Sequence, residues 1–175
     1  MQHLEFNIID PKFEIKCRHA LDQDLHAILD LMDLARSYMA LKGNPHQWDA
    51  GYPGAEIILS DIKEQAGYVL EDREHKIVAY FALYDYDKAY DKVYGGKWLN
   101  DEPYVCVHRL ATMQEQGLGT LILKMLQKNF ANIRMDTMNV NKPMRHLMEK
   151  LNFTYVGVIK LERNQGERVA YHYAR

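Results

Sequence analysis

The sequence predicts a mixed α/β fold of the α+β kind, in which strands and helices do not alternate strictly. Its amphipathic and β-rich segments follow the order β-α-α-β-β-β-α-β-α-β-β. A run of consecutive strands does not suit a doubly wound parallel sheet, which needs a helix between successive strands. The chain has 175 residues, of which 47% are hydrophobic and 26% are charged, so we expect one soluble domain over residues 1–175.

The first half of the chain predicts a strand, two helices and a strand hairpin. The strand covers residues 13–18, and Asp22 is the expected N-cap of the first helix. Apolar residues at helical spacing mark the buried face of that helix: Leu25, Ile28, Leu29, Met32, Ala35 and Met39. A Gly-Asn-Pro sequence ends it, an aromatic loop follows, and a second helix covers residues 55–63. Strands at 68–71 and 77–84 form the expected antiparallel hairpin.

The second half predicts the strongest strand and two more amphipathic helices. Residues 104–112 are rich in β-forming residues, whereas residues 85–100 fit no regular element. The apolar faces of the two helices are Leu118, Leu121, Ile122, Met125 and Leu126, and then Met144, Leu147, Met148 and Leu151. Further strands are expected at 133–137, 154–161 and 169–173.

Charge and cysteine content argue against several classes of partner. The formal net charge is -2 and no basic cluster is present, which argues against nucleic acid. The N-terminus lacks a signal-peptide pattern, and no run of about eighteen apolar residues is present to span a membrane. Cys17 and Cys106 form neither a disulfide framework nor a metal-ligand pattern. We therefore expect no metal, no membrane partner and a cytoplasmic location.

The segment with the most chemical information is the glycine-bearing turn at residues 114–120. Amides at a helix N-terminus lack intrahelical partners and attract anions, and glycine lets a phosphate approach the backbone closely. Two interpretations stay open from the residues alone: a pyrophosphate cradle, or a plain glycine turn. The turn is not a P-loop, because it has no Gly-Lys-Ser or Gly-Lys-Thr, and it lacks the third glycine of the dinucleotide fingerprint.

The pattern Gln114-x-x-Gly117-x-Gly119 resembles the cofactor loop of the GNAT superfamily of acetyltransferases. Upstream, the sequence His-Arg-Leu-Ala-Thr at 108–112 looks like the central strand of that family. Downstream, Asp136-Thr137, Asn141, Met144 and residues 147–153 resemble its second motif, in which an Asn precedes a short helix that ends in Gly-Phe. The first half is similar to uncharacterised bacterial members, through Gln-Trp at 47–48 and Gly-Tyr-Pro at 51–53.

This resemblance implies the GNAT fold for a single domain. Such a fold has a mixed, mostly antiparallel sheet of roughly six or seven strands, a splayed central strand and about four helices. The resemblance also implies acetyl-CoA as the acyl donor and CoA as the product. Carried over position by position, the cofactor-binding residues are Leu110, Ala111, Thr112, Gln114, Glu115, Gln116, Gly117, Leu118, Gly119, Thr120, Asn141 and Met144. For Asn141, a helix N-cap is the alternative, and both roles can coexist.

Three positions depart from the family pattern. Only Met113 separates the central strand from the glycine loop, Met148 stands where many members carry a tyrosine acid, and Asn152 replaces a glycine. The second departure removes a common general acid. Tyr171 and Tyr173 are possible substitutes, for which core packing is the alternative, and water is another possible acid.

His108 is the candidate general base. Histidine titrates near neutral pH, and the position matches a strand histidine of arylalkylamine N-acetyltransferases. Strand alternation predicts that its side chain shares a face with Cys106, Leu110 and Thr112. The alternative is a partly buried histidine that hydrogen-bonds a neighbouring strand.

The acceptor side is expected to come from the first helices and the 85–104 segment. The candidate acceptor-binding residues are Trp48, Tyr84, Glu102 and Tyr104, because rings and a carboxylate suit a cationic amine. Plain packing and a solvated acidic turn are the alternative.

The predicted function is transfer of the acetyl group of acetyl-CoA to a primary amine of a small molecule, by direct attack in a ternary complex. Two alternatives stay open: a non-catalytic acyl-CoA-binding sensor or regulatory module, and an enzyme of another class that binds a nucleotide at the same turn. The acceptor is left open among polyamines, arylalkylamines, amino sugars, antibiotics and peptide N-termini. The resemblance also leaves a homodimer open.

Overall fold

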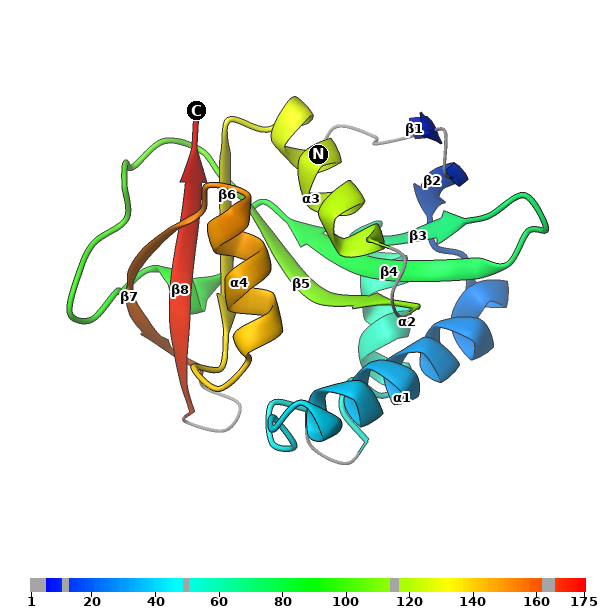
Figure 1. The fold of residues 1–175 in the computed structure, drawn as a ribbon, viewed down its shortest axis with the longest axis horizontal. Helices are drawn as coiled ribbons and strands as arrows, with labels where there is room; N and C mark the ends of the chain where they lie inside the picture. The colour runs from blue at the N-terminus through cyan, green and yellow to red at the C-terminus, as the bar shows by residue number, and fades with distance from the viewer. Residues whose placement is uncertain (1–5, 11–12, 49–50, 114–116, 162–165) are drawn as a thin grey trace.

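The structure, a computed structural model, describes residues 6–10, 13–48, 51–113, 117–161 and 166–175. The strands in these ranges form one sheet with the order β1-β2-β3-β4-β5-β6-β8-β7 (Figure 1). Their bounds are β1 (Phe6–Asp10), β2 (Phe13–His19), β3 (Gly67–Glu71), β4 (Ile77–Tyr84), β5 (Val105–Thr112), β6 (Asn132–Thr137), β7 (Thr154–Lys160) and β8 (Glu167–Ala174).

The sheet is mixed and mostly antiparallel, as predicted. Only β5 and β6 are parallel; every other neighbouring pair among the described strands is antiparallel. The sheet has eight strands, one more than expected, because residues 6–10 pair along β2.

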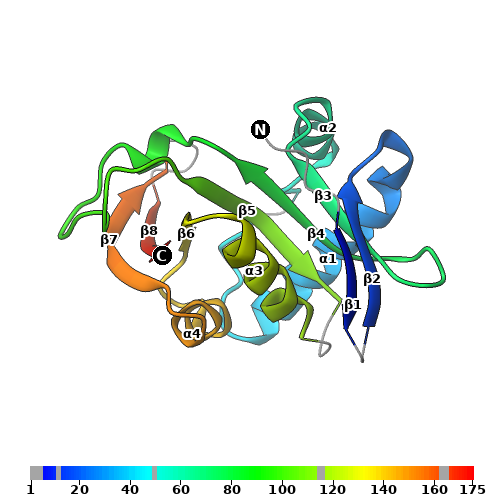
Figure 2. The same cartoon turned by 90° about the horizontal axis from the view of Figure 1, so that it is seen from above.

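Helices cover both faces of the sheet. They are α1 (Leu25–Leu41), α2 (Ala55–Lys63), α3 (Leu118–Asn129) and α4 (Lys142–Lys150), with short 3-10 turns at Asp22–Asp24 and Lys88–Tyr90. On the α3–α4 face, Leu118 joins Val107 in one buried cluster. On the α1–α2 face, Ile58 and Val69 belong to a second cluster. Figure 2 shows α2 on the far side of the sheet from α3 and α4. No helix in the described ranges combines the length and the apolar character that a membrane crossing requires.

The start of α1 differs from the sequence prediction. Asp22 lies in a 3-10 turn and the helix begins at Leu25, so Asp22 is not its N-cap. Asp24 stands at the N-cap position, but its carboxylate accepts from the Leu21 amide (2.8 Å) and pairs with Arg18. This ion pair, which no local pattern indicated, lies at the start of the helix.

The central strand is splayed, which confirms the prediction. β5 pairs with β6 only through Val105 opposite Ile133 and Cys106 opposite Arg134, within the described residues. Beyond these residues the two strands diverge (Figure 1). A strand edge that leaves its neighbour presents backbone N–H and C=O groups that need other partners. The free edge of β5 therefore begins after Cys106.

A β-bulge interrupts β5 along its other edge, against β4. Tyr80 pairs with Ala111 and Ala82 with His108, so two residues of β5 oppose one residue of β4. Arg109, inside the bulge, has a φ of 54°, which lies in the left-handed region. That conformation costs a non-glycine residue about 1–2 kcal/mol, so other contacts must hold it.

The bulge changes the direction of the residues that follow it. Leu110 packs with Val107 in the α3–α4 cluster, whereas Ala111 belongs to the α1–α2 cluster. The prediction that Leu110 shares the face of His108 is therefore wrong, because strict alternation takes no account of an inserted residue.

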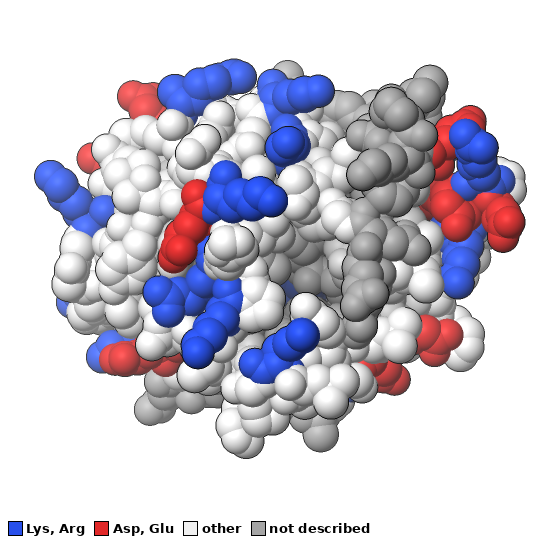
Figure 3. Space-filling view, viewed as in Figure 1, with Lys and Arg blue, Asp and Glu red and all other residues white. Residues whose placement is uncertain are grey.

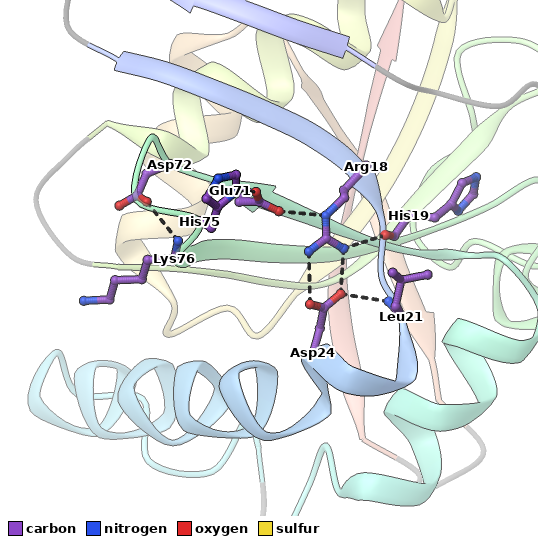
Figure 4. Close-up of polar contacts among 8 residues, drawn as sticks. All are labelled: Arg18, His19, Leu21, Asp24, Glu71, Asp72, His75 and Lys76. Atoms are coloured by element: carbon purple, nitrogen blue, oxygen red, sulfur yellow. Dashed lines mark hydrogen bonds and ion pairs between the residues drawn. The ribbon is translucent and has the colours of Figure 1, made fainter.

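Arg18 on β2 joins three segments away from the free edge of β5 (Figure 4). Its guanidinium donates two hydrogen bonds to Asp24 (2.7 and 3.0 Å) and one to Glu71 on β3 (2.8 Å). Burial raises the pKa of Asp24, but the hydrogen bonds from Arg18 and the Leu21 amide outweigh burial and leave that pKa below its usual value. Hydrogen bonds from His75 and then Arg18 lower the pKa of Glu71. Both carboxyls therefore stay charged at neutral pH.

Acid is expected to weaken this network. A carboxyl with a lowered folded-state pKa contributes stability that is fully present above its unfolded-state pKa and is lost as the pH falls through the folded value. We expect Asp24→Asn to lower the free energy of unfolding by about 1–3 kcal/mol at neutral pH, and the difference from the wild type to shrink below about pH 4. Urea denaturation across that pH range measures the difference. A difference that stays constant into acid would contradict the role of the charge.

Candidate active site

A cavity of about 880 Å³ opens beside the free edge of β5. All residues from 107 to 112 of β5 line it. At one end it is lined by Gly119 of α3 and Met144 and Leu147 of α4, and at the other by Glu56 and Asp61 of α2. Because α2 and the α3–α4 pair lie on opposite faces of the sheet, the cavity passes through the sheet where β5 and β6 diverge.

The start of α3 supplies backbone donors next to this cavity. Gly117 is the N-cap, with a φ of 71° and no side-chain cap, and the Leu121 amide donates to its carbonyl (3.1 Å). The amides of residues 118–120 therefore have no partner within the helix. The cofactor-binding predictions for Gln114, Glu115 and Gln116 fall outside the described residues.

The structure brings half of the predicted cofactor residues to the cavity. Those that line it are Leu110, Ala111, Thr112, Gly119, Asn141 and Met144. The side chain of Leu118 is buried in the α3–α4 cluster, and Thr120 is half-buried outside the lining. Leu118 therefore offers only its backbone to a ligand at the helix start. Gly117 is exposed and leaves open space where a side chain would begin.

Basic side chains gather on the face that α3 and α4 form (Figure 3). The cationic residues of the two helices are Lys124, Lys128, Lys142, Arg145 and Lys150, and Glu149 is the one acidic residue in the same two helices. A field of this sign favours an anionic ligand on the α3–α4 side of the cavity.

Asn141 caps α4 and also holds a loop from the opposite face. Its Oδ1 accepts from the Met144 amide (3.3 Å), which confirms the N-cap role. Its Nδ2 donates to Oε1 of Gln47 (3.0 Å), and the hydroxyl of Thr137 donates to the same oxygen (3.0 Å). Gln47 follows α1, so one amide oxygen joins that loop to the end of β6 and the start of α4.

His108 lines the cavity and is paired with a carboxylate. Its Nε2 lies 3.0 Å from Oδ2 of Asp87, and the two side chains are 17% and 28% exposed. The hydrogen bond from His108 lowers the pKa of Asp87, and the Ala89 amide also donates to this carboxylate (2.8 Å). Because Nε2 faces a carboxylate, it carries the ring proton, and Nδ1 is left as the acceptor of the neutral ring. Sequence reasoning missed Asp87, which lies in a segment without periodicity.

A second carboxyl faces the cavity from β6. Asp136 lines the cavity and accepts a hydrogen bond from the buried hydroxyl of Tyr90 (2.8 Å). Burial raises the pKa of Asp136, and the charges of His108 and Arg168 act in the opposite direction. The cavity lining therefore contains two carboxyl groups, those of Asp87 and Asp136, besides His108. Sequence reasoning gave Asp136 no catalytic or binding role.

The structure places Tyr171 outside the cavity. Its hydroxyl donates to Glu149 (2.8 Å) and accepts from Nε of Arg145 (3.0 Å), and its ring is buried in the α3–α4 cluster. The geometry gives its predicted role as general acid no support, because β8 turns this residue toward α4. Tyr173 also packs against that cluster, next to Phe153.

The four predicted acceptor residues divide into two pairs. Trp48 and Tyr84 line the cavity, whereas Glu102 and Tyr104 do not. Glu102 is exposed, and Tyr104 stacks on the guanidinium of Arg134, with 3.9 Å between Cζ and the ring centroid. Acceptor roles for Glu102 and Tyr104 are therefore unsupported, because the segment before β5 turns them toward Arg134 and solvent.

Comparison with solved structures identifies the family. A GNAT-family acetyltransferase from Streptococcus agalactiae matches with 30% sequence identity and a TM-score of 0.83, covering 93% of this chain and 97% of the other. The chain belongs to the GNAT family of acetyltransferases. GNAT-family acetyltransferases from Listeria monocytogenes (15% identity, TM-score 0.70, covering 94% and 97%) and Bacillus cereus (12% identity, TM-score 0.59, covering 92% and 97%) share the fold. No protein-family model and no curated protein matches the sequence.

Membership of the GNAT family assigns acyl transfer as the general activity. Members of this family use acetyl-CoA as the co-substrate. The side chain of Met148, at the position of the common tyrosine acid, is buried in the α3–α4 cluster. Met148 therefore cannot serve as the general acid, because its side chain has no proton to donate and is buried.

The double role of Asn141 leads to a stability prediction. Asn141→Ala removes the cap of α4 and one donor to Gln47, so we expect the free energy of unfolding to fall by about 1–2 kcal/mol. His146→Ala, at an exposed position of the same helix, is the matched control. Denaturant unfolding of the two variants measures the difference, and equal stabilities would contradict the capping role.

Proposed function

We propose that this GNAT-family chain is an N-acetyltransferase that moves the acetyl group of acetyl-CoA to the primary amine of a small molecule. The observation that carries the proposal is the cavity itself. It joins the start of α3 on one face, whose first three amides have no partner within the helix, to the His108–Asp87 pair on the other. A donor and an acceptor bound at its two ends meet at the free edge of β5.

The residues on the α3–α4 side suit the phosphates and the arm of acetyl-CoA. The amides of 118–120 and the basic face of the two helices attract a pyrophosphate. The free edge of β5 offers peptide groups to the amides of the pantetheine arm, and Met144 and Leu147 supply apolar contact. In this arrangement acetyl-CoA supplies the electrophilic carbonyl carbon of its thioester. A backbone N–H among residues 110–112 is the donor for the oxygen that gains charge.

His108 acts as the general base in this proposal. The amine nitrogen forms a bond to the acetyl carbon while the carbon–sulfur bond breaks, and Nδ1 of His108 takes the proton that the nitrogen loses. Asp87 holds the ring in the required tautomer and stabilises the charged ring that results. CoA leaves as a thiolate and takes its proton from water or from the charged ring.

The acceptor enters from the α1–α2 side. Aromatic residues line this part of the cavity: Tyr38, Trp48, Tyr52, Tyr84 and Tyr86. Rings of this kind pack against the carbon body of an amine, and Glu56 adds a carboxylate to the same lining. The acceptor class in this proposal is a small primary amine with an apolar body.

Binding and turnover measurements test the proposal in two steps. A ligand that binds only the folded protein raises its melting temperature, by the equivalent of about 2.7 kcal/mol at one hundred times the Kd. We expect acetyl-CoA to do so and ATP and NAD not to. An amine panel that includes polyamines, arylalkylamines and amino sugars is then screened for CoA release. Tight CoA binding with no release for any amine would favour the acyl-CoA sensor, and stabilisation by ATP or NAD alone would overturn the assignment of the loop.

The role of His108 makes a kinetic prediction. We expect His108→Ala to lower kcat by a factor of roughly 10²–10⁴ and to leave the Kd of acetyl-CoA unchanged, because the ring acts on the amine and not on the cofactor. His26→Ala, on the exposed face of α1, is the control. Steady-state kinetics and calorimetry give the two constants. An unchanged kcat would remove His108 from the mechanism.

A further inference from the structure

The bulge in β5 coincides with a buried contact between this strand and α2. Arg109 has a left-handed backbone conformation, yet it lies between His108 and Leu110, two residues of the cavity wall. Conformations of this kind persist only where the surroundings hold them. The source of that constraint is the side chain of Arg109 itself.

Asp61 of α2 receives this side chain in a buried ion pair. Its carboxylate accepts from Nε (2.8 Å) and Nη2 (2.6 Å) of Arg109, in the two-pronged geometry that suits a guanidinium. The side chain of Asp61 is 2% exposed and that of Arg109 is 12% exposed. Separating such a pair leaves an uncompensated charge in the interior, so the pair resists rearrangement.

The same carboxylate also accepts hydrogen bonds from the hydroxyls of two tyrosines of β4, the strand next to β5. Tyr80 and Tyr84 of β4 each donate to Asp61 at 2.6 Å. Burial and the charge of Asp61 raise the pKa of both tyrosines, so both hydroxyls keep the proton that they donate. Tyr80 lies where the β4–β5 register shifts. Asp61 thus binds both strands at the bulge.

We propose that Asp61 is a positioning residue that fixes the bulge of β5 through Arg109 and so aims the backbone of residues 110–112 at the thioester. The proposal rests on the function proposed above for this edge of β5. In this proposal Asp61 acts through Arg109, and both residues also belong to the cavity lining. The pair also connects α2, whose residues line the acceptor side, to the strand that binds the donor.

Hydrogen exchange on the ligand-free protein tests the effect on the backbone. Among residues 110–112, we expect Asp61→Asn to speed exchange of the amides that bond to β4 at least about tenfold, because the bulge then opens locally. Asp24→Asn is the matched control: it removes the charge of another buried Asp that receives a two-pronged Arg, but far from the cavity. The control is expected to lower the melting temperature and to leave exchange at 110–112 unchanged.

A double-mutant cycle tests the route through Arg109. Glycine adopts the left-handed conformation without strain, so Arg109→Gly removes the side chain and still permits the bulge. We expect Arg109→Gly to raise the Kd of acetyl-CoA. In that background Asp61→Asn is expected to add less than about a twofold change, since its partner is already gone. If the Asp61→Asn variant does not fold, hydrogen exchange is measured on Arg109→Gly instead. The double variant then serves as a second sample, because it does not leave the Asp61 carboxylate buried without its partner.

The outcomes separate this proposal from the proposed function. Unchanged exchange at 110–112 in a folded Asp61→Asn protein overturns the positioning role, whatever the activity. Fully additive effects on the Kd overturn the route through Arg109. If the exchange result holds while no amine is acetylated by the wild type, the positioning role stands and the transferase proposal fails.

Discussion

The parallel pairing of β5 with β6 extends over two residues of each strand, and the rest of the site depends on how short it is. Two parallel strands that continued side by side would satisfy each other's backbone and close the sheet. Because they part after Cys106, the next six residues of β5 line a cavity that reaches both faces of the sheet. The α3–α4 face then supplies helix amides and positive charge, and the α1–α2 face supplies rings and carboxylates.

Sequence periodicity predicted most of the helices and strands, because the spacing of buried apolar residues along a segment depends on its secondary structure. The stripe from Leu25 to Met39 became α1, and the expected strand at 77–84 matches β4. The predictions failed where a distant charge decides the local conformation. Asp24, which pairs with Arg18, stands at the N-cap position of α1 two residues after the predicted Asp22. Arg109 pairs with Asp61, 48 positions away, and the bulge that accompanies this contact reverses the direction of later side chains.

For the candidate site, too, the sequence predicted the residues of local motifs and missed those whose position depends on distant contacts. Motif resemblance selected Gly119 and Asn141, which both line the cavity. It succeeded there because the backbone conformation at a helix start depends on residues that are adjacent in sequence. It also located His108, but not Asp87, whose segment has no regular spacing. Glu102 and Tyr104 lie outside the cavity lining, because closeness to β5 in sequence does not determine which way a loop turns. Arg134 stacks against Tyr104 and draws that ring away from the cavity.

The hydrogen bonds of Gln47 connect the two ends of the cavity. Its single amide oxygen takes hydrogen bonds from Thr137 and Asn141, while Trp48, the next residue, forms part of the acceptor wall. A molecule that shifts the start of α4 therefore displaces the loop after α1 by the same contact. By the reciprocity of linked equilibria, occupancy of either end then changes the affinity of the other by an equal factor. Such coupling would make the two substrates bind cooperatively through one glutamine side chain, with no moving domain.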